Sequence, residues 1–417
     1  MNDKALYCVI DLKSFYASCE CAARHLDIFS TPLVVCDPTR GPSTIVMSAT
    51  PYLKKTYGVP NVCRRRDLPN VPNLILAQPR MAYYVEMSSR VVSIFLDFVD
   101  EADLHVYSID ESFLNIGPYL KVSHCTAEQY VAKIQQRIKD ELGLVATAGI
   151  GPNMFLAKIC LDNEGKKKPP YCAQWTLADI PTKLWTISPI TEVWGISDGI
   201  ERRLRLMGIR SVEGLARAKR EDLEKQFGIL GDQLHDLANG IDRTDIREKY
   251  VPKETHLSIG QELSRDYTLE EAKLILREMS DDLCLRLRLS GQKTGEVSLF
   301  IAYSVQAEGG FAHQMSLLKP TDDNDTIYQA ILELFNRYSE PKPVRNLGLG
   351  FGKLGHYEYQ QLDVFESSEL LTEKKNLHKA IDKIQLTYGR NACLRLSSLT
   401  KASTIHERHQ QIGGHKA

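Results

Sequence analysis

The sequence has almost no excess of charge of either sign. Its 417 residues include 52 lysines and arginines against 53 aspartates and glutamates, a formal net charge of −1 at pH 7. The chain therefore lacks a global field that would attract a polyanion, and any nucleic-acid contact must come from local patches. Three stretches qualify, although a charge run usually marks a solvated face: CRRRDLP (63–69), EGKKKPP (164–170) and IERRLRLMGIR (200–210).

Cys-x-x-Cys pairs and long apolar runs are also missing. The ten cysteines are scattered and form no Cys-x-x-Cys pair. They indicate small buried thiols in a reducing compartment, and they argue against disulfides and against a zinc site. There is no secretory signal and no apolar run long enough to cross a bilayer. We therefore expect a soluble, cytoplasmic protein with no membrane partner.

What is present is an ordinary globular composition, with 43% hydrophobic and 25% charged residues. The length suggests two to four domains. Strand and helix patterns are intermixed up to about residue 168, which favours an α+β or α/β sheet domain. Short helices follow as far as residue 239, and then a charged, turn-rich stretch without periodicity. Beyond it the patterns predict a complete small βαββαβ domain, a final helix and a polar tail.

Two groups of acids interrupt the apolar patterns of the first domain. The apolar run ALYCVI ends in Asp11, where an unpaired carboxylate is costly unless a basic side chain or a metal neutralises it. YSIDESFLNI places Asp110 and Glu111 at a turn between two strand-like runs, and a tight turn lets both side chains reach one point. Three acids that converge at the end of a sheet require cations, and two Mg²⁺ ions are the common solution.

The motifs IDLKSFYASCE and YSIDESFLNI match the two catalytic motifs of one family, and further matches follow in order along the chain: GIGPNMFLAKI, VWGISDGIERRLRLMGI, LSIGQEL and NLGLGFGKL. On these residues the chain resembles a Y-family, or translesion, DNA polymerase, most closely the UmuC-like bacterial branch. The resemblance implies a multi-domain α+β right-hand fold with palm, fingers, helix-hairpin-helix thumb and βαββαβ little finger. The expected ranges are palm 1–25 and 76–168, fingers 26–75, thumb 169–240, linker 241–255, little finger 256–358 and C-terminal extension 359–417.

The resemblance also assigns roles to individual residues. Asp11, Asp110 and Glu111, with the backbone carbonyl of Leu12, would hold two Mg²⁺ ions. The remaining positions would contact the incoming dNTP, and they are Phe15, Tyr16, Tyr52, Lys55 and Lys158. Tyr16 is at the steric-gate position, where an aromatic ring excludes the 2′-hydroxyl of a ribonucleotide. From the residues alone, Phe15 and Tyr16 could equally be core aromatics.

Two positions depart from the family pattern. Ala49 stands where many relatives have threonine, so one phosphate contact is lost or is supplied by the neighbouring Ser48 or Thr50. Lys55 stands where arginine is frequent, which keeps the charge and loses the bidentate geometry. We expect altered nucleotide affinity from these changes, without loss of activity.

Two further stretches predict macromolecular partners. VWGISDGIERRLRLMGI is typical of a helix-hairpin-helix, whose glycines let backbone N–H groups approach a DNA phosphate; its candidate contacts are Gly195, Ile196, Gly199, Arg202 and Arg203. QLDVF resembles a sliding-clamp-binding pentapeptide, formed by Gln361, Leu362, Asp363, Val364 and Phe365. The alternative for QLDVF is a linker whose apolar residues pack on the last strand.

The predicted function is template-directed, error-prone DNA synthesis in damage tolerance. The expected partners are primed template DNA, dNTP, the sliding clamp, and recombinase or other accessory proteins. Two alternatives stay open: a non-catalytic, clamp-tethered DNA-binding relative, and another two-metal nucleotidyl-transfer enzyme such as a cyclase. Neither alternative should extend a primer.

Overall fold

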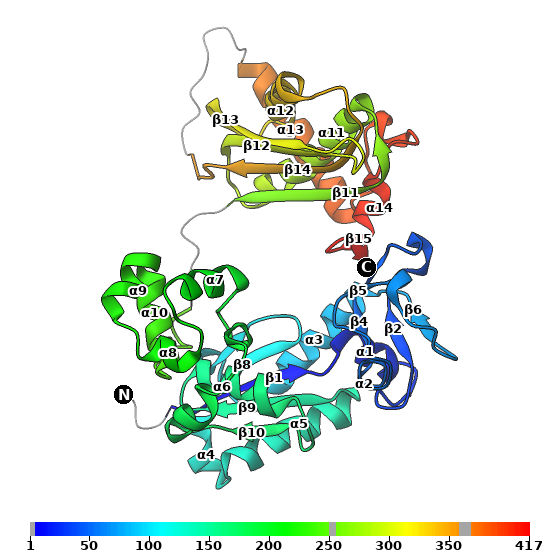
Figure 1. The fold of residues 1–417 in the computed structure, drawn as a ribbon. Coiled ribbons are helices and arrows are strands. Elements are labelled where there is room, and N and C mark those ends of the chain that lie inside the picture. The colour runs from blue at the N-terminus through cyan, green and yellow to red at the C-terminus, as the bar shows by residue number, and fades with distance from the viewer. Residues whose placement is uncertain (1–4, 250–255, 358–367) are drawn as a thin grey trace. The chain divides into compact units, whose positions relative to one another are not determined.

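Figure 1 shows the computed structural model of the chain, which describes residues 5–249, 256–357 and 368–417. The chain divides into two compact units. Unit 1 comprises Met1–Lys249 with His415–Ala417, and unit 2 comprises Tyr250–Gly414. Each unit has a hydrophobic core of its own and is described separately.

A five-stranded sheet forms the centre of unit 1. Its strands lie in the order β10 (Cys172–Gln174), β9 (Ala146–Gly151), β1 (Tyr7–Leu12), β8 (Glu111–Asn115) and β7 (Leu104–Val106). β1 is antiparallel to both β8 and β9, and β10 is parallel to β9. Every residue of β1 except Asp11 is buried, as its continuous apolar run predicts for a strand covered on both faces.

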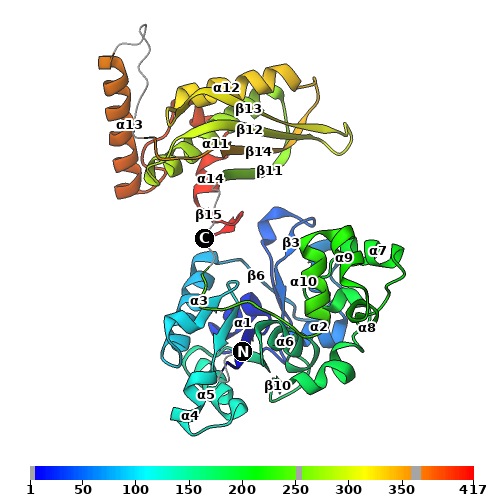
Figure 2. The ribbon, with the colours of Figure 1, turned by 90° about the vertical axis from the view of Figure 1, so that its left-hand side faces the viewer.

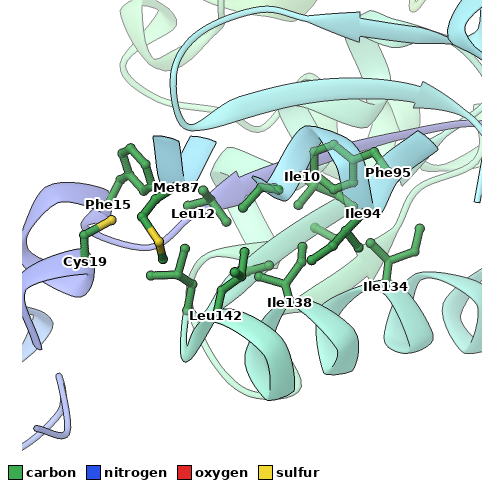
Figure 3. Packing of buried hydrophobic residues seen from close by; sticks show 14 of the residues in the cluster. Ile10, Leu12, Phe15, Cys19, Met87, Ile94, Phe95, Ile134, Ile138 and Leu142 are labelled. Atoms are coloured by element: carbon green, nitrogen blue, oxygen red, sulfur yellow. The ribbon is translucent and has the colours of Figure 1, made fainter. Parts of the chain in front are cut away.

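Alternate residues of β1 face opposite sides of the sheet. One side packs against helices α3 (Met81–Leu96) and α5 (Ala127–Leu142), and Figure 3 shows Ile10 and Leu12 among the side chains of these helices. On the other side, Tyr7 and Val9 pack with Phe113 of β8 and with helix α6 (Met154–Cys160). By this alternation Asp11 belongs to the α6 side of the sheet.

Helix α6 lies unusually close to strand β9 because two positions of the strand are glycine. A Cβ atom at Gly149 would lie 2.2 Å from the backbone nitrogen of Leu161, and one at Gly151 would lie 2.5 Å from that of Ala157. Any larger residue at these positions would force the helix away from the sheet. A π-helical segment, Leu161–Gly165, continues directly from α6.

A small subregion of unit 1 is built from short strands. Strand β2 (Leu33–Val35) lies between β4 (Ser48–Ala49) and β6 (Ile75–Ala77), while β3 (Ile45–Val46) pairs with β5 (Cys63–Arg64). Helix α2 (Pro51–Tyr57) follows β4, with proline in its first turn and Gly58 at its C-cap with a φ of 66°. Helices α1 (Phe15–Ala22) and α4 (Gly117–Ser123) follow β1 and β8.

Four short helices after residue 190 surround a third apolar cluster that includes Trp175, Leu204 and Leu223. They are α7 (Asp198–Leu206), α8 (Val212–Ala216), α9 (Arg220–Phe227) and α10 (Ile229–Ala238). Glycines with positive φ lie before α7 (Gly195), between α7 and α8 (Gly208) and between α9 and α10 (Gly228), which agrees with the broken helical pattern of the sequence.

The first part of the expected linker 241–255 is packed on unit 1. Ile246 is only 3% exposed and joins the cluster of Tyr7, Val9 and Phe113. Arg247 contacts both carboxylate oxygens of Asp103 at 2.9 and 3.1 Å. Single side chains, and not one face of a helix or strand, anchor the segment. For this reason its sequence shows neither helical nor strand periodicity. Residues 250–255 lie outside the described part.

Unit 2 has the predicted βαββαβ order. Its elements are β11 (Leu257–Tyr267), α11 (Leu269–Leu289), β12 (Thr294–Tyr303), β13 (Gly310–Thr321), α12 (Asn324–Tyr338) and β14 (Val344–Gly352). The strands are arranged as β11-β14-β12-β13, with each neighbouring pair antiparallel. Helices α11 and α12 lie on one face of this sheet, as Figure 2 shows.

The last part of the chain comprises α13 (Ser368–Tyr388), α14 (Ile405–His409), β15 (Gln411–Ile412) and β16 (His415–Lys416). One histidine of the polar tail, His409, has a fixed partner. Its Nε2 lies 2.8 Å from a carboxylate oxygen of the buried Asp282 in α11. The QLDVF stretch at 361–365 lies outside the described residues. No helix in the described ranges has the length and apolar character needed to cross a bilayer.

Candidate active site

The three predicted acids lie at one end of the central sheet of unit 1. Asp11 and Glu111 are direct partners across the β1–β8 pair, and Asp110 is the last residue of the turn before β8. The backbone N–H of Leu12 donates to the carbonyl of Asp110 at 2.9 Å, which fixes the turn against β1. Ser108 Oγ donates to Asp110 Oδ1 at 2.8 Å.

Two lysines neutralise two of these acids. Lys158 of α6 places its Nζ 2.7 Å from Glu111 Oε1 and donates a hydrogen bond to Oε2 at 2.8 Å. Lys166 places its Nζ 2.9 Å from Asp11 Oδ2. The close approach of α6 to β9 allows the first contact, and the turn after the π-helical segment allows the second. In this structure a lysine therefore neutralises the carboxylate on which strand β1 ends.

The electrostatics of the acids reflect their burial. Burial raises the pKa of Asp11 above its ordinary value, although Lys166 opposes the shift. Burial likewise raises the pKa of Glu111 against the opposing effect of Lys158. For Lys166 burial acts in the other direction, but Asp11 and Asp162 outweigh it and raise its pKa. The acids therefore depend on nearby positive charge to remain ionised.

The donor set fits a hard divalent cation. Carboxylate and carbonyl oxygens are the ligands that Mg²⁺ prefers, and the buried Glu111 offers two carboxylate oxygens, each within 2.8 Å of the positively charged Lys158 Nζ. Within the described residues, no three aspartate, glutamate, histidine or cysteine side chains are grouped to hold an ion as they stand. Asp11 and Glu111 contact lysines instead, so the side chains would have to turn toward an ion.

The aromatic pair of the first motif divides between core and site. Phe15 is buried in the main core, whereas Tyr16 is only partly buried and stacks on Tyr84 with ring centres 4.8 Å apart. Burial raises the pKa of the Tyr16 hydroxyl, and the charge of Asp110 adds to the shift. Phe15 is therefore a core aromatic. Tyr16 lies close enough to Asp110 for the charge of that carboxylate to affect its pKa.

A buried carboxylate holds the partner of Tyr16 in place. Glu20 is fully buried, accepts a hydrogen bond from Tyr84 Oη at 2.8 Å and is paired with Arg80 at 2.9 Å and with Arg24. Burial alone would raise the pKa of Glu20, but these hydrogen bonds outweigh it and lower the pKa. Only the pair of Glu20 and Arg24 has a local signal, their spacing of four residues, because Arg80 and Tyr84 lie 60 and 64 residues from Glu20 in the chain.

The two lysines of helix α2 have different surroundings. Lys55 is exposed, whereas the neighbouring Lys54 is half-buried and interacts electrostatically with Asp11 and Lys166. Tyr52 packs against Tyr57 with ring centres 6.1 Å apart. Burial lowers the pKa of Lys54, with Asp11 opposing the shift and Lys166 adding to it.

The hydroxyls that flank Ala49 are already used. Thr50 Oγ1 donates to the carbonyl of Thr31 at 2.8 Å, and Ser48 Oγ donates to the carbonyl of Ser14 at 3.3 Å. Ala49 itself is buried. Of the two possibilities for the missing threonine, the structure therefore favours loss of the contact over replacement by a neighbour.

Sequence reasoning missed Asp162 and the role of Lys166. Asp162 contacts Lys158 at 3.2 Å and Lys166 at 3.0 Å, and Lys13 Nζ donates to the carbonyl of Lys166 at 2.9 Å. Two signals were present: the KKK run, and the spacing of four residues between Lys158, Asp162 and Lys166. Neither signal shows that the lysines face the acids, since that depends on how α6 packs on the sheet.

The predicted DNA-contact motif is folded as short helices around glycine turns. Gly195 has a φ of 94° and open space around it, and Gly199 lies in the first turn of α7. Arg202 is exposed, but Ile196 is buried. Arg203 donates to the carbonyl of Gln226 and lies over the ring of Phe227 at 4.1 Å. Of the predicted side chains, Arg202 is therefore the more available to an external phosphate.

Comparison with known proteins identifies the family. The impB/mucB/samB family pattern matches residues 10–162, and its C-terminal domain pattern matches residues 255–364. The Bacillus subtilis (strain 168) protein UvrX, whose name refers to UV-damage repair, is 36% identical over 99% of this chain and 98% of its own length. The chain belongs to the impB/mucB/samB family.

Other relatives and a solved structure extend this result. DNA polymerase IV 2 of the same organism is 32% identical, covering 100% of this chain and 99% of its own length. DNA polymerase IV of Pelotomaculum thermopropionicum is 31% identical, with coverages of 95% and 96%. A Y-family DNA polymerase chimera of Dbh and Dpo4 has a TM-score of 0.66 and 20% identity, over 84% of this chain and 98% of its own.

The resemblance to Y-family polymerases and the expected fold class are thus confirmed, while the narrower assignment to the UmuC-like branch stays a prediction. For this member of the impB/mucB/samB family, the first matched segment contains all three acids and Lys158. It ends at Asp162, so Lys166 lies just beyond it. The second segment spans the sheet and the two helices α11 and α12 of unit 2.

Proposed function

We propose that the protein is a template-directed DNA polymerase of the translesion type, which joins a dNTP to a primer 3′-hydroxyl and releases pyrophosphate. The observation that carries the proposal is the end of the central sheet. Asp11 and Glu111 are paired across adjacent strands, Asp110 is fixed beside them, and lysines and a stacked tyrosine surround the three. Relatives named DNA polymerase IV, similar over nearly their whole length, support the same reading.

Asp11, Asp110, Glu111 and the Leu12 carbonyl would hold two Mg²⁺ ions. Such ions, when bound, lower the pKa of the attacking hydroxyl and stabilise the charge that develops on the phosphates. The protein supplies the oxygen ligands on a rigid sheet edge, so that the reacting groups are positioned before the reaction. Tyr16, backed by Tyr84, would exclude the 2′-hydroxyl of a ribonucleotide.

We propose that Lys166, in place of the predicted Lys158, is the main lysine for the triphosphate on this side of the site. The side chain of Lys158 is only 8% exposed and is enclosed by Glu111 and Asp162. That of Lys166 is 33% exposed and can turn outward. Tyr52 and Lys55 of α2 remain candidate contacts, and Lys54 joins them because it interacts with Asp11.

The domain assignment is kept as a proposal with one change. Palm (1–25 and 76–168), fingers (26–75), thumb (169–240) and little finger (256–358) stay as expected, and 241–249 belong with unit 1. Gly195, Gly199 and Arg202 would contact the DNA backbone without reading bases, which makes binding dependent on salt. The small fingers region would leave the site loosely enclosed, which suits damaged templates and low fidelity. The sliding clamp at 361–365, recombinase and other accessory partners also remain proposals.

The deciding experiment is Mg²⁺-dependent extension of a primed DNA template by the wild type and Asp110→Ala. We expect extension by the wild type and a loss of at least about a thousandfold in the variant, since the lost carboxylate acts on the transition state. Asp140→Ala, at an exposed aspartate of α5, is the matched control and should extend normally.

Equal extension by the wild type and Asp110→Ala would contradict the assigned site and point to a contaminating polymerase. If neither protein extends the primer even with sliding clamp added, the proposal fails in favour of a non-catalytic relative or one that needs accessory proteins.

A further inference from the structure

Asp162 lies between the two lysines that neutralise the catalytic acids. Its Oδ2 is 3.2 Å from Lys158 Nζ, and its Oδ1 is 3.0 Å from Lys166 Nζ. Each lysine reaches a different acid on its other side, Glu111 or Asp11. One carboxylate therefore connects two ion pairs that belong to two neighbouring strands.

Other charges nearby make this carboxylate important for Lys166. Lys13 donates to the backbone carbonyl of Lys166 at 2.9 Å, and Lys54 lies near enough to interact with Lys166 electrostatically. Lys166 is thus surrounded by like charges, and within the described part of the chain it forms ion pairs with Asp11 and Asp162. Asp162 has no place among the proposed metal ligands, so its charge stays available to the lysine throughout the reaction.

We propose that Asp162 is a positioning residue, which keeps Lys166 in the site and directs its ammonium group toward the triphosphate of the incoming nucleotide. The inference rests on the proposed polymerase function. In the loaded enzyme Asp11 shares its charge with metal, which weakens its hold on Lys166. Asp162 is then the carboxylate that still anchors the lysine, and the phosphate oxygens take the place of Asp11 as its second partner.

The side chain of Asp162 is 31% exposed, so its replacement is compatible with folding. The test is dGTP binding to the protein on a dideoxy-terminated primer opposite template dC, with Ca²⁺ in place of Mg²⁺ so that no chemistry is required. We expect Asp162→Asn to raise the dissociation constant of dGTP about tenfold, the usual effect of removing one partner of a partly buried charged contact.

Three further measurements separate positioning from a structural role. The dissociation constant for primer–template should stay within about twofold of the wild type, and in Mg²⁺ the KM for dGTP should rise more than kcat falls. Asp162→Glu, which keeps the carboxylate, should recover most of the affinity. Glu333→Gln removes an exposed ion pair with Arg337 in α12 and is the matched control, with no expected change.

Unchanged dGTP binding by Asp162→Asn, beside a wild type that extends primers, would overturn the positioning role and leave the proposed function intact. Equal weakening of dGTP and DNA binding, without recovery by Asp162→Glu, would also overturn it, because that pattern indicates a general structural defect. A wild type that extends no primer would overturn the proposed function and this inference with it.

Discussion

At the scale of single residues, the position of the Tyr16 ring depends on a chain of contacts that leads away from the acids. Tyr16 stacks on Tyr84, Tyr84 donates to Glu20, and Glu20 is held by Arg80. A ring that excludes a 2′-hydroxyl must resist displacement by about an ångström, and a stacked partner with a fixed hydroxyl supplies that resistance. The position of the proposed gate ring therefore depends on α1 and α3 together.

Removing the ring should relax the choice of sugar without removing the chemistry. We expect Tyr16→Ala to raise the ratio of ribonucleotide to deoxyribonucleotide incorporation by at least about a hundredfold, since a clash of a few kcal/mol is lost. The measurement is kcat/KM for rGTP and dGTP on the same primed template. Tyr83→Ala, beside Tyr84 on the same helix, is the control. An unchanged ratio in Tyr16→Ala would show that another group selects the sugar.

The acids and Tyr16 could be predicted from the sequence because each belongs to a contiguous motif. The roles of Glu20 and Asp162 could not be predicted, although Glu20 is the last residue of the motif IDLKSFYASCE. Their roles arise from partners up to 64 residues away, as for Tyr84 and Glu20, and a linear pattern contains no such pairing. Lys166 belongs to the basic run EGKKKPP, and the run itself does not show which of its lysines contacts an acid.

At the scale of elements, residues 241–249 show how a segment without periodicity can still be ordered. Asp242 Oδ2 accepts from the backbone N–H of Phe155 at 2.9 Å, at the start of α6. Ile246 then fills the cluster on the α6 side of the sheet, and Arg247 pairs with Asp103. The segment thus covers the same layer that carries Lys158, which links it to the geometry of the site.

Truncating the buried side chain of this segment should destabilise unit 1. We expect Ile246→Ala to lower the free energy of unfolding by about 2–4 kcal/mol, through lost burial and a cavity beside Phe113. The control is Ile241→Ala in the same segment, where the side chain is 44% exposed and the loss should stay below about 1 kcal/mol. Denaturant unfolding followed by tryptophan fluorescence measures both. Equal effects of the two substitutions would restore the linker interpretation.

Strands β1 and β8 and the helices α3 and α5 could be predicted because their apolar residues recur with the period of the element. The close packing of α6 on β9 follows from Gly149 and Gly151, and the sequence shows these glycines without showing what they meet. The π-helical segment after α6 has no sequence signal of its own. It displaces the residues that follow, including Lys166, from the positions an ideal helix would give them.

At the scale of the whole molecule, the two units have separate cores, and the chain's three tryptophans, Trp175, Trp185 and Trp194, all lie in unit 1. The length predicted several domains, and the βαββαβ pattern predicted the sheet of unit 2. The docking of the tail on unit 2 was not predicted. It depends on Arg390, Arg408 and His409 meeting Asp282, more than a hundred residues earlier in the chain.

Asp282 should make unit 2 dependent on pH in the acid range. Burial opposes its ionisation, but His409, Arg408 and Arg390 outweigh this and lower its pKa from 3.8 to about 2. Because the pKa is lower in the folded state, the charged carboxylate stabilises unit 2 at any pH above the pKa of the unfolded chain. This contribution, about 2 kcal/mol, is lost as the pH falls from about 4 toward 2. We therefore expect Asp282→Asn to destabilise unit 2 by about 2 kcal/mol at pH 7.

The measurement follows unfolding of the full-length protein by circular dichroism and by tryptophan fluorescence. Asp282→Asn should shift the circular-dichroism transition of unit 2 and leave the fluorescence transition of unit 1 in place, because the tryptophans report unit 1 alone. The difference from the wild type should shrink between pH 4 and pH 2. Asp266→Asn, whose carboxylate contacts Arg345 at 3.5 Å near the surface, is the control and should change neither transition. Two results would contradict this prediction. The difference in stability between the wild type and Asp282→Asn could stay as large at pH 2 as at pH 7, or the fluorescence transition of unit 1 could shift together with the circular-dichroism transition. Either result would show that the cluster of arginines and His409 does not stabilise unit 2 through the charge of Asp282.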